Sequence, residues 1–373
     1  MTKPRLRDLG ITIGDLPAGP HNAITDVPGV LVGHTTVVRD EPRVTRTGVT
    51  VIQPRGDVRD NPVFAGYHVL NGCGEMTGMA FVEEFGWLSS PIALTDTTQV
   101  GLVRDALIRY AVERYGKGAH YLGVVGETWG GWLNDRDGFA LTDADVFAAM
   151  DGLAAGPVAE GNVGGGTAMI CYDFKGGIGT SSRQVELAGK GFTVGVLVQA
   201  NHGERIQLRV DGVPVGRELG AEVVPLAFAS PPAVDADADE ASSGPTQTGS
   251  ILTVIATDAP LLPLQCKRVA RRGAMGLART GSVAHTGSGD LFLVFATGND
   301  LPFAEEQPYT LRALPDWSLD PLFDAVTEAV EEAILNALVA AETMTGFAGH
   351  RAPALPHDEL QRVMARYRPG PPA

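Results

Sequence analysis

The stretch that decides the fold is PTQTGSILTVIATDAPLL, residues 245–262. Within it, ILTVIA at 251–256 is apolar on both faces, and such a strand belongs in the middle of a sheet that is covered on both sides. The run before it, 230–249, consists almost entirely of Pro, Ala, Asp, Ser and Gly, which is the composition of a flexible linker. The sequence therefore predicts an acidic linker that joins two halves of one core, residues 1–249 and 250–373.

Composition and charge limit the class of protein. The chain has 373 residues, a hydrophobic fraction of 44% and a formal net charge of −15. Its one basic cluster, 267–272, has helical spacing, so we expect no nucleic-acid partner. No early apolar run has the length of a signal peptide, and no segment reaches about eighteen uninterrupted apolar residues. We therefore expect a soluble, cytoplasmic protein without a membrane partner.

Cysteine and histidine usage gives no sign of a metal or cofactor. Cys73, Cys171 and Cys266 are far apart and form no CxxC pair, so they are expected to be buried thiols rather than disulfides or zinc ligands. The histidines are scattered singly, and the motifs GxSxG, SxxK and HExxH are absent. The sequence predicts neither a metal site nor a cofactor.

Hydrophobic periodicity and turn residues outline the elements. Strands are expected at 29–37, 48–54, 78–86, 90–97, 121–128, 192–203, 251–257 and 290–298. Helices are expected at 99–115, 142–153, 264–280 and 319–343. Thr142 and Asp145 have the spacing of a capping box, and Asp211-Gly212 is typical of a hairpin turn. The glycine clusters GNVGGGT at 161–167 and KGGIGTSS at 175–182 are expected to be loops.

Two motifs have weak functional interpretations. Asp235, Asp237 and Asp239 imitate the start of a calcium loop, but Glu240 stands where that loop needs glycine and Thr246 where it needs glutamate. GNVGGGT is similar to a phosphate loop, yet no lysine follows and GxGxxG is not completed. Close packing of its backbone under another segment is the favoured interpretation.

Ser250 has an ordinary and a chemical interpretation. Gly249-Ser250 could simply be a turn before a strand. If the chain were cut between these residues, however, Ser250 would carry both its hydroxyl and a free α-amine, whose reference pKa is about 7.7 to 8.0. Such a nucleophile contains its own general base and needs no histidine. Glycine at 249 would permit the distorted backbone that attack on its carbonyl requires.

Several motifs, in this order, resemble the DmpA-type peptidases, the L-aminopeptidase D-Ala-esterase/amidase family that includes the β-aminopeptidases. They are TDVPGVLVGHTT at 25–36, NGCGEMTG at 71–78, VVGETWGGWLND at 124–135, GNVGGGT at 161–167, QANHG at 199–203, the stretch 248–282 and GSGDLFLVFATGN at 287–299. The resemblance implies a single-domain αββα sandwich, self-cleaved into residues 1–249 and 250–373 and assembled into a tetramer of such pairs.

The resemblance also implies roles for individual residues. Ser250 would be the nucleophile, with autocleavage after Gly249. Ser288 and Asp290 match the family's serine and acidic residue, which would hydrogen-bond the nucleophile and hold its proton. The remaining matches are Asn201 for the oxyanion hole and Glu127 for the substrate ammonium group. Outside the family context, Asp290 could merely start a strand, Asn201 cap a turn and Glu127 be an exposed charge.

One substitution departs from the family pattern. Tyrosine often follows GET in the family, whereas this chain has Trp129, whose indole donates a hydrogen bond but cannot accept one. Trp129 is therefore a substrate-binding candidate that could change the acyl residues accepted.

The predicted activity is a serine aminopeptidase, amidase or esterase that acts on short peptides and amino-acid amides through an acyl-enzyme on Ser250. The first alternative is an acyltransferase related to ornithine acetyltransferase, which a threonine nucleophile would favour. The second is a non-enzymatic, glycine-rich binding protein.

Overall fold

The computed structural model describes residues 3–56, 58–117, 122–187, 189–228, 249–302 and 308–368. The predicted linker, 230–249, lies outside the described residues except for Gly249, and so does the calcium-like run 235–240.

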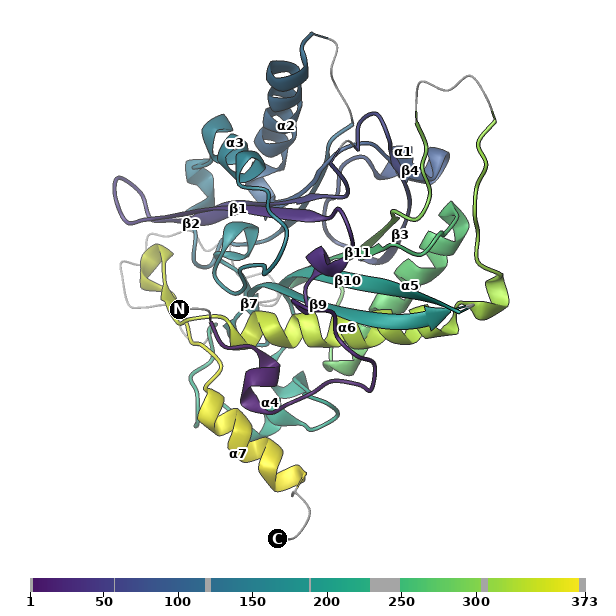
Figure 1. The fold of residues 1–373 in the computed structure, drawn as a ribbon. Coiled ribbons are helices and arrows are strands. Elements are labelled where there is room, and N and C mark those ends of the chain that lie inside the picture. The colour runs from purple at the N-terminus through teal and green to yellow at the C-terminus, as the bar shows by residue number, and fades with distance from the viewer. Residues whose placement is uncertain are drawn as a thin grey trace.

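The described chain forms four layers, two sheets stacked between two pairs of helices (Figure 1). The four-stranded sheet has the order β1 (Leu31–Arg39), β2 (Thr45–Gln53), β5 (Ile92–Asp96) and β6 (Val124–Thr128). The six-stranded sheet has the order β4 (Trp87–Leu88), β3 (Val63–Gly72), β12 (Gly289–Ala296), β11 (Ser250–Thr257), β10 (Lys190–Asn201) and β9 (Gly177–Leu187). The predicted αββα sandwich is confirmed.

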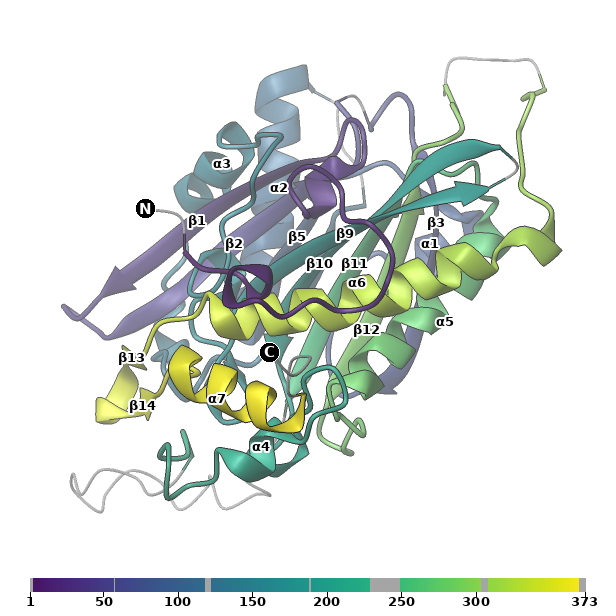
Figure 2. The same cartoon turned by 60° about the horizontal axis from the view of Figure 1, so that its bottom comes forward.

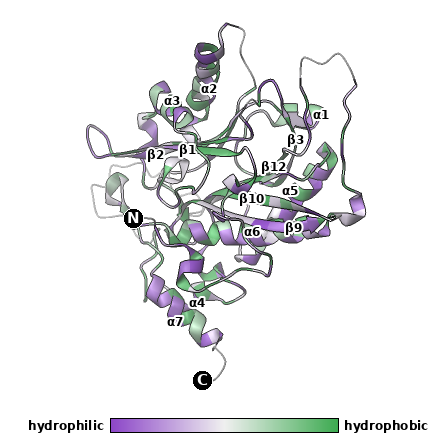
Figure 3. Cartoon of the chain, viewed as in Figure 1, coloured by the Kyte–Doolittle hydropathy of each residue, from purple (hydrophilic) through white to green (hydrophobic). Residues whose placement is uncertain are grey.

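Helices cover the outer face of each sheet. α2 (Val100–Tyr115) and α3 (Asp143–Asp151) pack on the four-stranded sheet, and α5 (Pro263–Arg279) and α6 (Asp320–Val339) pack on the six-stranded sheet (Figure 2). The smaller elements are α1 (Met79–Phe85), α4 (Val215–Glu218), α7 (His357–Tyr367), β7 (Ile170–Cys171), β8 (Phe174–Lys175), β13 (Met344–Thr345) and β14 (Arg351–Ala352). Figure 3 shows hydrophilic and hydrophobic residues along α7, which buries Leu360, Val363 and Met364.

β11 confirms the prediction made from 251–256. All eight of its residues are buried, and it lies between β10, which runs antiparallel to it, and β12, which runs parallel. β12 then pairs with β3. Because β10 and β3 come from residues 1–249 whereas β11 and β12 come from 250–373, the two halves form one sheet and one core.

Three local predictions need correction. The stretch 78–86, expected to be a strand, forms α1, because Gly78 and Gly86 adopt left-handed conformations that begin and end a helical turn. The stretch 175–182, expected to be a loop, enters β9. Its glycines serve close packing, since a methyl group on Gly179 would lie 1.9 Å from the carbonyl oxygen of Ala333 in α6. Cys73 is exposed, whereas Cys171 and Cys266 are buried as expected.

Other local predictions are confirmed. Thr142 and Asp145 form the capping box of α3. Asp211 and Gly212 both have positive φ, and Val210 and Val213 pair across them, as in a two-residue hairpin turn.

A buried ionic cluster ties α6 to the amino-terminal half. The Arg183 side chain is fully buried and donates to Glu328 at 2.9 Å, to Glu332 at 2.6 Å and to the carbonyl oxygen of Ile13 at 2.7 Å. Arg7 donates to both carboxylate oxygens of Glu332, at 2.8 and 2.9 Å. Burial alone would raise the pKa of Glu332, but the bond from Arg7 and both guanidinium charges outweigh it and hold that pKa below its usual value.

We predict that Arg183→Leu lowers the free energy of unfolding by about 3–5 kcal/mol, because it removes the counter-charge of Glu328 and one of the two counter-charges of Glu332. Urea unfolding measures this, with exposed Arg209→Leu as the matched control. Adding Glu332→Leu should recover part of the loss, and a double variant whose two losses simply add would contradict the proposed coupling.

Candidate active site

Ser250 begins β11 in the centre of the six-stranded sheet. The register places its Cα opposite Asn201 of β10 on one side and opposite Gly289 of β12 on the other. The backbone N–H of Gly289 lies within 3.2 Å of two acceptors, the Ser250 Oγ and the carbonyl oxygen of Gly249. The Ser250 hydroxyl and the Gly249 carbonyl therefore share one hydrogen-bond donor and lie beside each other.

Gly249 is a glycine for a different reason from the one expected. Its φ is not in the left-handed region. Instead, a methyl group at this position would lie 2.7 Å from the Cα of His202 and 3.0 Å from the carbonyl oxygen of Asn201. Close approach to the end of β10, rather than backbone distortion, therefore excludes a side chain here.

Ser288 and Asp290 are joined beside this point. The Ser288 hydroxyl donates to Asp290 Oδ1 at 2.7 Å, while Asp290 Oδ2 is buried with no hydrogen-bond partner among the described residues. Burial raises the pKa of Asp290 to about 6, against the hydrogen bonds from Ser288 and from the backbone of Ile251. The bond to Ile251 places the carboxylate next to the first peptide unit of β11.

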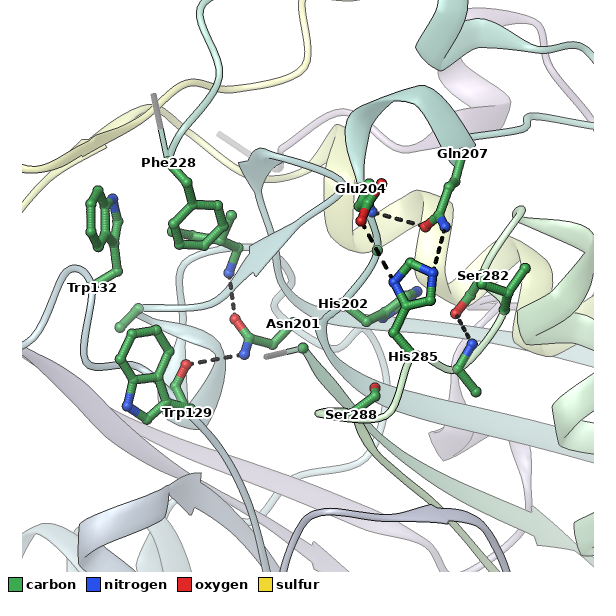
Figure 4. A pocket seen from close by; sticks show the side chains of 16 residues that line it. Trp129, Trp132, Asn201, His202, Glu204, Gln207, Phe228, Ser282, His285 and Ser288 are labelled. Atoms are coloured by element: carbon green, nitrogen blue, oxygen red, sulfur yellow. Dashed lines mark hydrogen bonds and ion pairs between the residues drawn. The ribbon is translucent and has the colours of Figure 1, made fainter. Parts of the chain in front are cut away.

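The Asn201 side chain is fixed at both ends. Its Oδ1 accepts the backbone N–H of Ile170 at 2.8 Å, and its Nδ2 donates to the carbonyl oxygen of Trp129 at 3.0 Å (Figure 4). The second N–H of this amide, next to Ser250, donates to none of the described residues. An amide held in this way can donate to an oxyanion without reorienting.

Glu127 is a buried carboxylate at the end of β6. Its Oε1 accepts the backbone N–H of Glu75 at 2.9 Å, and its Oε2 accepts the hydroxyl of Thr97. It has no ion pair with any described residue, and burial raises its pKa despite these two bonds. Gly74 lies between Glu127 and β12, since a methyl group there would lie 3.4 Å from Glu127 Oε1 and 3.1 Å from Gly289 Cα.

A pocket opens on the other side of Asn201. Its lining residues are Trp129, Trp132, Ala168, Ile170, Asn201, His202, Gly203, Glu204, Gln207, Phe228, Gly249, Ser282, Val283, Ala284, His285 and Ser288. Figure 4 shows aromatic side chains on one side of Asn201, and Glu204, Gln207 and His285 on the other. Of the predicted site residues, Trp129, Asn201, Gly249 and Ser288 line this pocket, whereas Ser250, Asp290 and Glu127 do not.

Sequence reasoning missed three contributors. The N–H of Gly289 lies inside the motif GSGD, where only the serine and the acid were considered. The sequence around Trp132 and Phe228 does not show whether these residues lie in a pocket wall or in the core. The described residues contain no group of three His, Cys, Asp or Glu that could hold a metal ion, and none of their helices is long and apolar enough to span a membrane.

The four-layer fold, with a serine, a carboxylic acid and an amide gathered at the start of a central strand, defines a hydrolase of the Ntn type. The model of peptidase family S58 matches residues 22–352. The β-peptidyl aminopeptidase BapA of Sphingosinicella microcystinivorans is 44% identical over 98% of this chain and 93% of its own length. The chain belongs to peptidase family S58.

Two solved structures agree with this. A β-aminopeptidase of a Burkholderia species superposes with a TM-score of 0.88 at 45% identity, over 99% of this chain and all of the other. The L-aminopeptidase D-Ala-esterase/amidase of Ochrobactrum anthropi, described as a variant of the Ntn hydrolase fold, gives 0.86 at 42% identity over 98% and 99%. The chain is thus an aminopeptidase, and neither the acyltransferase nor the non-enzymatic alternative is favoured.

The packing of Gly249 generates a stability prediction. In a Ser250→Ala background, Gly249→Ala should lower the free energy of unfolding by about 1–3 kcal/mol, because backbone of β10 must move to admit the methyl group. Thermal or urea unfolding measures the loss. Gly191→Ala, at a position with open space around it, is the control. Equal effects of the two substitutions would contradict the close approach at Gly249.

Proposed function

We propose that the chain cuts itself between Gly249 and Ser250, and that Ser250 then serves as the amino-terminal nucleophile of a serine aminopeptidase. The observation that carries this proposal is the shared donor, the N–H of Gly289, which holds the Ser250 hydroxyl beside the Gly249 carbonyl. Attack forms an Oγ–C bond and breaks the C–N bond, and the hydroxyl proton passes to the freed amine. Water then hydrolyses the ester, which releases the Gly249 carboxylate and restores the hydroxyl.

The unpartnered Asp290 Oδ2 supports the same proposal. A buried carboxylate oxygen that accepts no hydrogen bond lowers the stability of the folded protein. None of the described residues donates to Asp290 Oδ2, so a new donor beside it would remove this cost. The α-amine created at Ser250 would supply one next to the Ile251 amide that already contacts Asp290. In this role Asp290, oriented by Ser288, holds the amine that takes the hydroxyl proton during acylation and returns it to the leaving group.

Substrate selection follows from Glu127 and Asn201. Glu127 is buried without a cation, so the ammonium group of a substrate would complete its charge pair, and a substrate with a blocked amine would leave it unpaired. Asn201 and Gly289 would donate to the oxyanion, and losing one such donor typically costs about 2.7–4 kcal/mol of barrier. Trp129, which anchors Asn201 through its carbonyl oxygen, lines the pocket for the acyl residue.

The names of the relatives describe enzymes that act on β-peptides, L-aminoacyl bonds and D-alanine esters or amides. We therefore propose short peptides, amides and esters with a free amino terminus as substrates, hydrolysed without metal or cofactor. Rates on the amides of L-alanine, β-alanine and D-alanine decide among the three residue types.

We further propose a cytoplasmic homo-oligomer, a tetramer of cleaved pairs. Exposed apolar side chains such as Trp317 at 97% and Leu264 at 69% support self-association, because they would be covered in an assembly. Light scattering of the purified protein measures the mass, and fractionation of cells measures the location.

Self-cleavage predicts two fragments on a denaturing gel, residues 1–249 and 250–373, and the sequence SILTV at the amino terminus of the smaller one. Ser250→Ala should leave one full-length band and no amidase activity, because both steps use the same hydroxyl. Ser282→Ala, a serine of the pocket wall, is the control and should still be cut. Full activity in a single unbroken chain would refute the proposal.

The ionisation of Asp290 predicts the pH dependence. Because the α-amine must be neutral to take the hydroxyl proton and the Asp290 carboxylate must be ionised to hold the ammonium that results, kcat should fall as the pH drops below the amine's reference pKa of about 7.7 to 8.0 and fall further through about 6, the raised pKa of Asp290. Glu127 contributes to kcat/KM, but less to kcat, because bound substrate pairs with it. Ser288→Ala removes a bond that lowers the pKa of Asp290, so the acid limb of kcat should move to higher pH.

Initial rates at saturating substrate between pH 4.5 and 8 test this prediction, with Ser282→Ala as the matched serine control. A profile of kcat that stays flat across pH 6, or a limb that Ser288→Ala moves downward, would contradict the role given to Asp290.

A further inference from the structure

Arg205 is a buried cation that the proposed mechanism does not use. It opens the 3-10 helix Arg205–Gln207, just after β10 and Asn201, and only 4% of it is exposed. Its guanidinium donates to five carbonyl oxygens of the described residues. They belong to Tyr172 at 3.0 Å, Asp173 at 2.7 Å, Leu219 at 3.0 Å, Val224 at 3.1 Å and Pro225 at 3.5 Å. The nearby carboxylate of Asp173 accepts the Arg205 backbone N–H and interacts favourably with the guanidinium charge. Burial lowers the pKa of Arg205 to about 10, so it stays charged near neutrality.

These carbonyls come from two different segments. The first is the hairpin β7–β8, where the ring of Phe174 lies 3.4 Å beneath the guanidinium carbon. This hairpin supports the oxyanion candidate, because Ile170 at its start donates to Asn201 Oδ1. The second segment, 219–225, belongs to the chain that leads to the cleavage point. Arg205 therefore joins the hairpin that supports Asn201 to residues 219–225.

The second segment continues into the pocket wall. The carbonyl oxygen of Ala227 accepts the indole N–H of Trp132 at 3.1 Å, and the rings of Trp132 and Phe228 lie 5.1 Å apart. The Trp132 ring is also stacked on His350 at 3.6 Å. Phe228 is the last described residue before 229–248, and Figure 4 shows it next to Trp132 at the aromatic side of the pocket.

We propose that Arg205 is a positioning residue that holds 219–228 as a permanent wall of the substrate pocket, and that Phe228 on this wall selects bulky apolar side chains. None of the five carbonyl bonds involves the peptide bond between Gly249 and Ser250, so all five survive its cleavage. Arg205 thus holds residues 219–225, and with them the described wall up to Phe228, whether or not the chain is cut.

The selected side chain belongs to the amino-terminal residue of the substrate. Trp129, which lines the same pocket as Trp132, anchors Asn201 through its carbonyl oxygen, so the aromatic wall borders the amide that is proposed to hold the scissile carbonyl. This kinetic part rests on the proposed function. The anchoring of 219–228 does not, because it concerns contacts that are present in the uncut chain.

Hydrogen exchange followed by mass spectrometry tests the anchor in uncut Ser250→Ala and in wild type. In the segment 219–228, Val223 and Val224 donate their amides to the Gly220 carbonyl oxygen. Arg205→Met should speed exchange there by at least about tenfold while peptides of β11 keep their protection. Exposed Arg217→Met, in the same region, is the control. Unchanged exchange in 219–228 with Arg205→Met would overturn the anchor.

Kinetics on leucine and alanine p-nitroanilides test the wall. Phe228→Ala should raise KM for the leucine substrate about tenfold relative to the alanine substrate, with kcat nearly unchanged. Arg205→Met should raise KM for the leucine substrate over the alanine substrate in the same way, and Arg205→Lys should do so less. The double variant of Arg205→Met and Phe228→Ala should show no more than the larger single effect, because both substitutions act through Phe228. Equal changes for both substrates, or effects that add, would overturn the selection role.

The two arms separate the possible failures. If Arg205→Met does not fold, Phe228→Ala still tests selection, and Arg205→Lys still tests the anchor by exchange. If the protein is not cut or does not hydrolyse these substrates, the proposed function fails, while exchange in uncut Ser250→Ala still supports or overturns the anchoring by Arg205.

Discussion

The position of β11 between β10 and β12 is the constraint on which the site depends. Sheet register alone puts Asn201 and Gly289 on either side of Ser250 and brings the Gly289 N–H to both the hydroxyl and the Gly249 carbonyl. Because β11 and β12 pair along their lengths with each other and with β10 and β3, a cut before Ser250 leaves this register in place, and the interstrand bond that depends on the cut peptide unit is the one from Gly289 to the Gly249 carbonyl. The reactive geometry can therefore outlast the peptide bond that it is proposed to cleave.

The electrostatics of the site point in the same direction. The carboxyl groups of Glu127, Asp290 and Asp96 are buried, and burial raises the pKa of each, to about 6 for the two aspartates. No described cation forms an ion pair with any of the three. Where the described residues supply no cation, the buried carboxylates favour a group that carries its own positive charge, such as a new α-amine at Ser250 or the free amine of a substrate. The proposed self-cleavage and the proposed selection for free amino termini would thus have a common physical basis.

The sequence contained the strand pattern and the helices that flank it, because 251–256 and the helical periodicities are local signals. It could not show why glycine occupies 179 or 249, since the reason in each case is a distant backbone, that of Ala333 or of His202. The same limit explains the error at 175–182, where glycine and serine permit contact with α6. The site residues came from motifs, whereas the orientation of Asn201 by Ile170 and the position of Gly74 before Glu127 depend on tertiary structure.

The glycine-rich turn 164–166 shows how the use of backbone groups decides what such a loop can bind. A phosphate loop directs N–H groups at its ligand. Here the fully buried Lys175 side chain donates to the carbonyl oxygens of Gly166, Met169 and Gly176, so a carbonyl group of the turn is already occupied by a donor from its own chain, and burial holds the pKa of this lysine well below its usual value. Arg205 uses carbonyl oxygens in the same way on the other side of the β7–β8 hairpin. Two buried basic side chains thus stabilise the backbone that orients Asn201, and among the described residues neither forms an ion pair with Glu127 or Asp290.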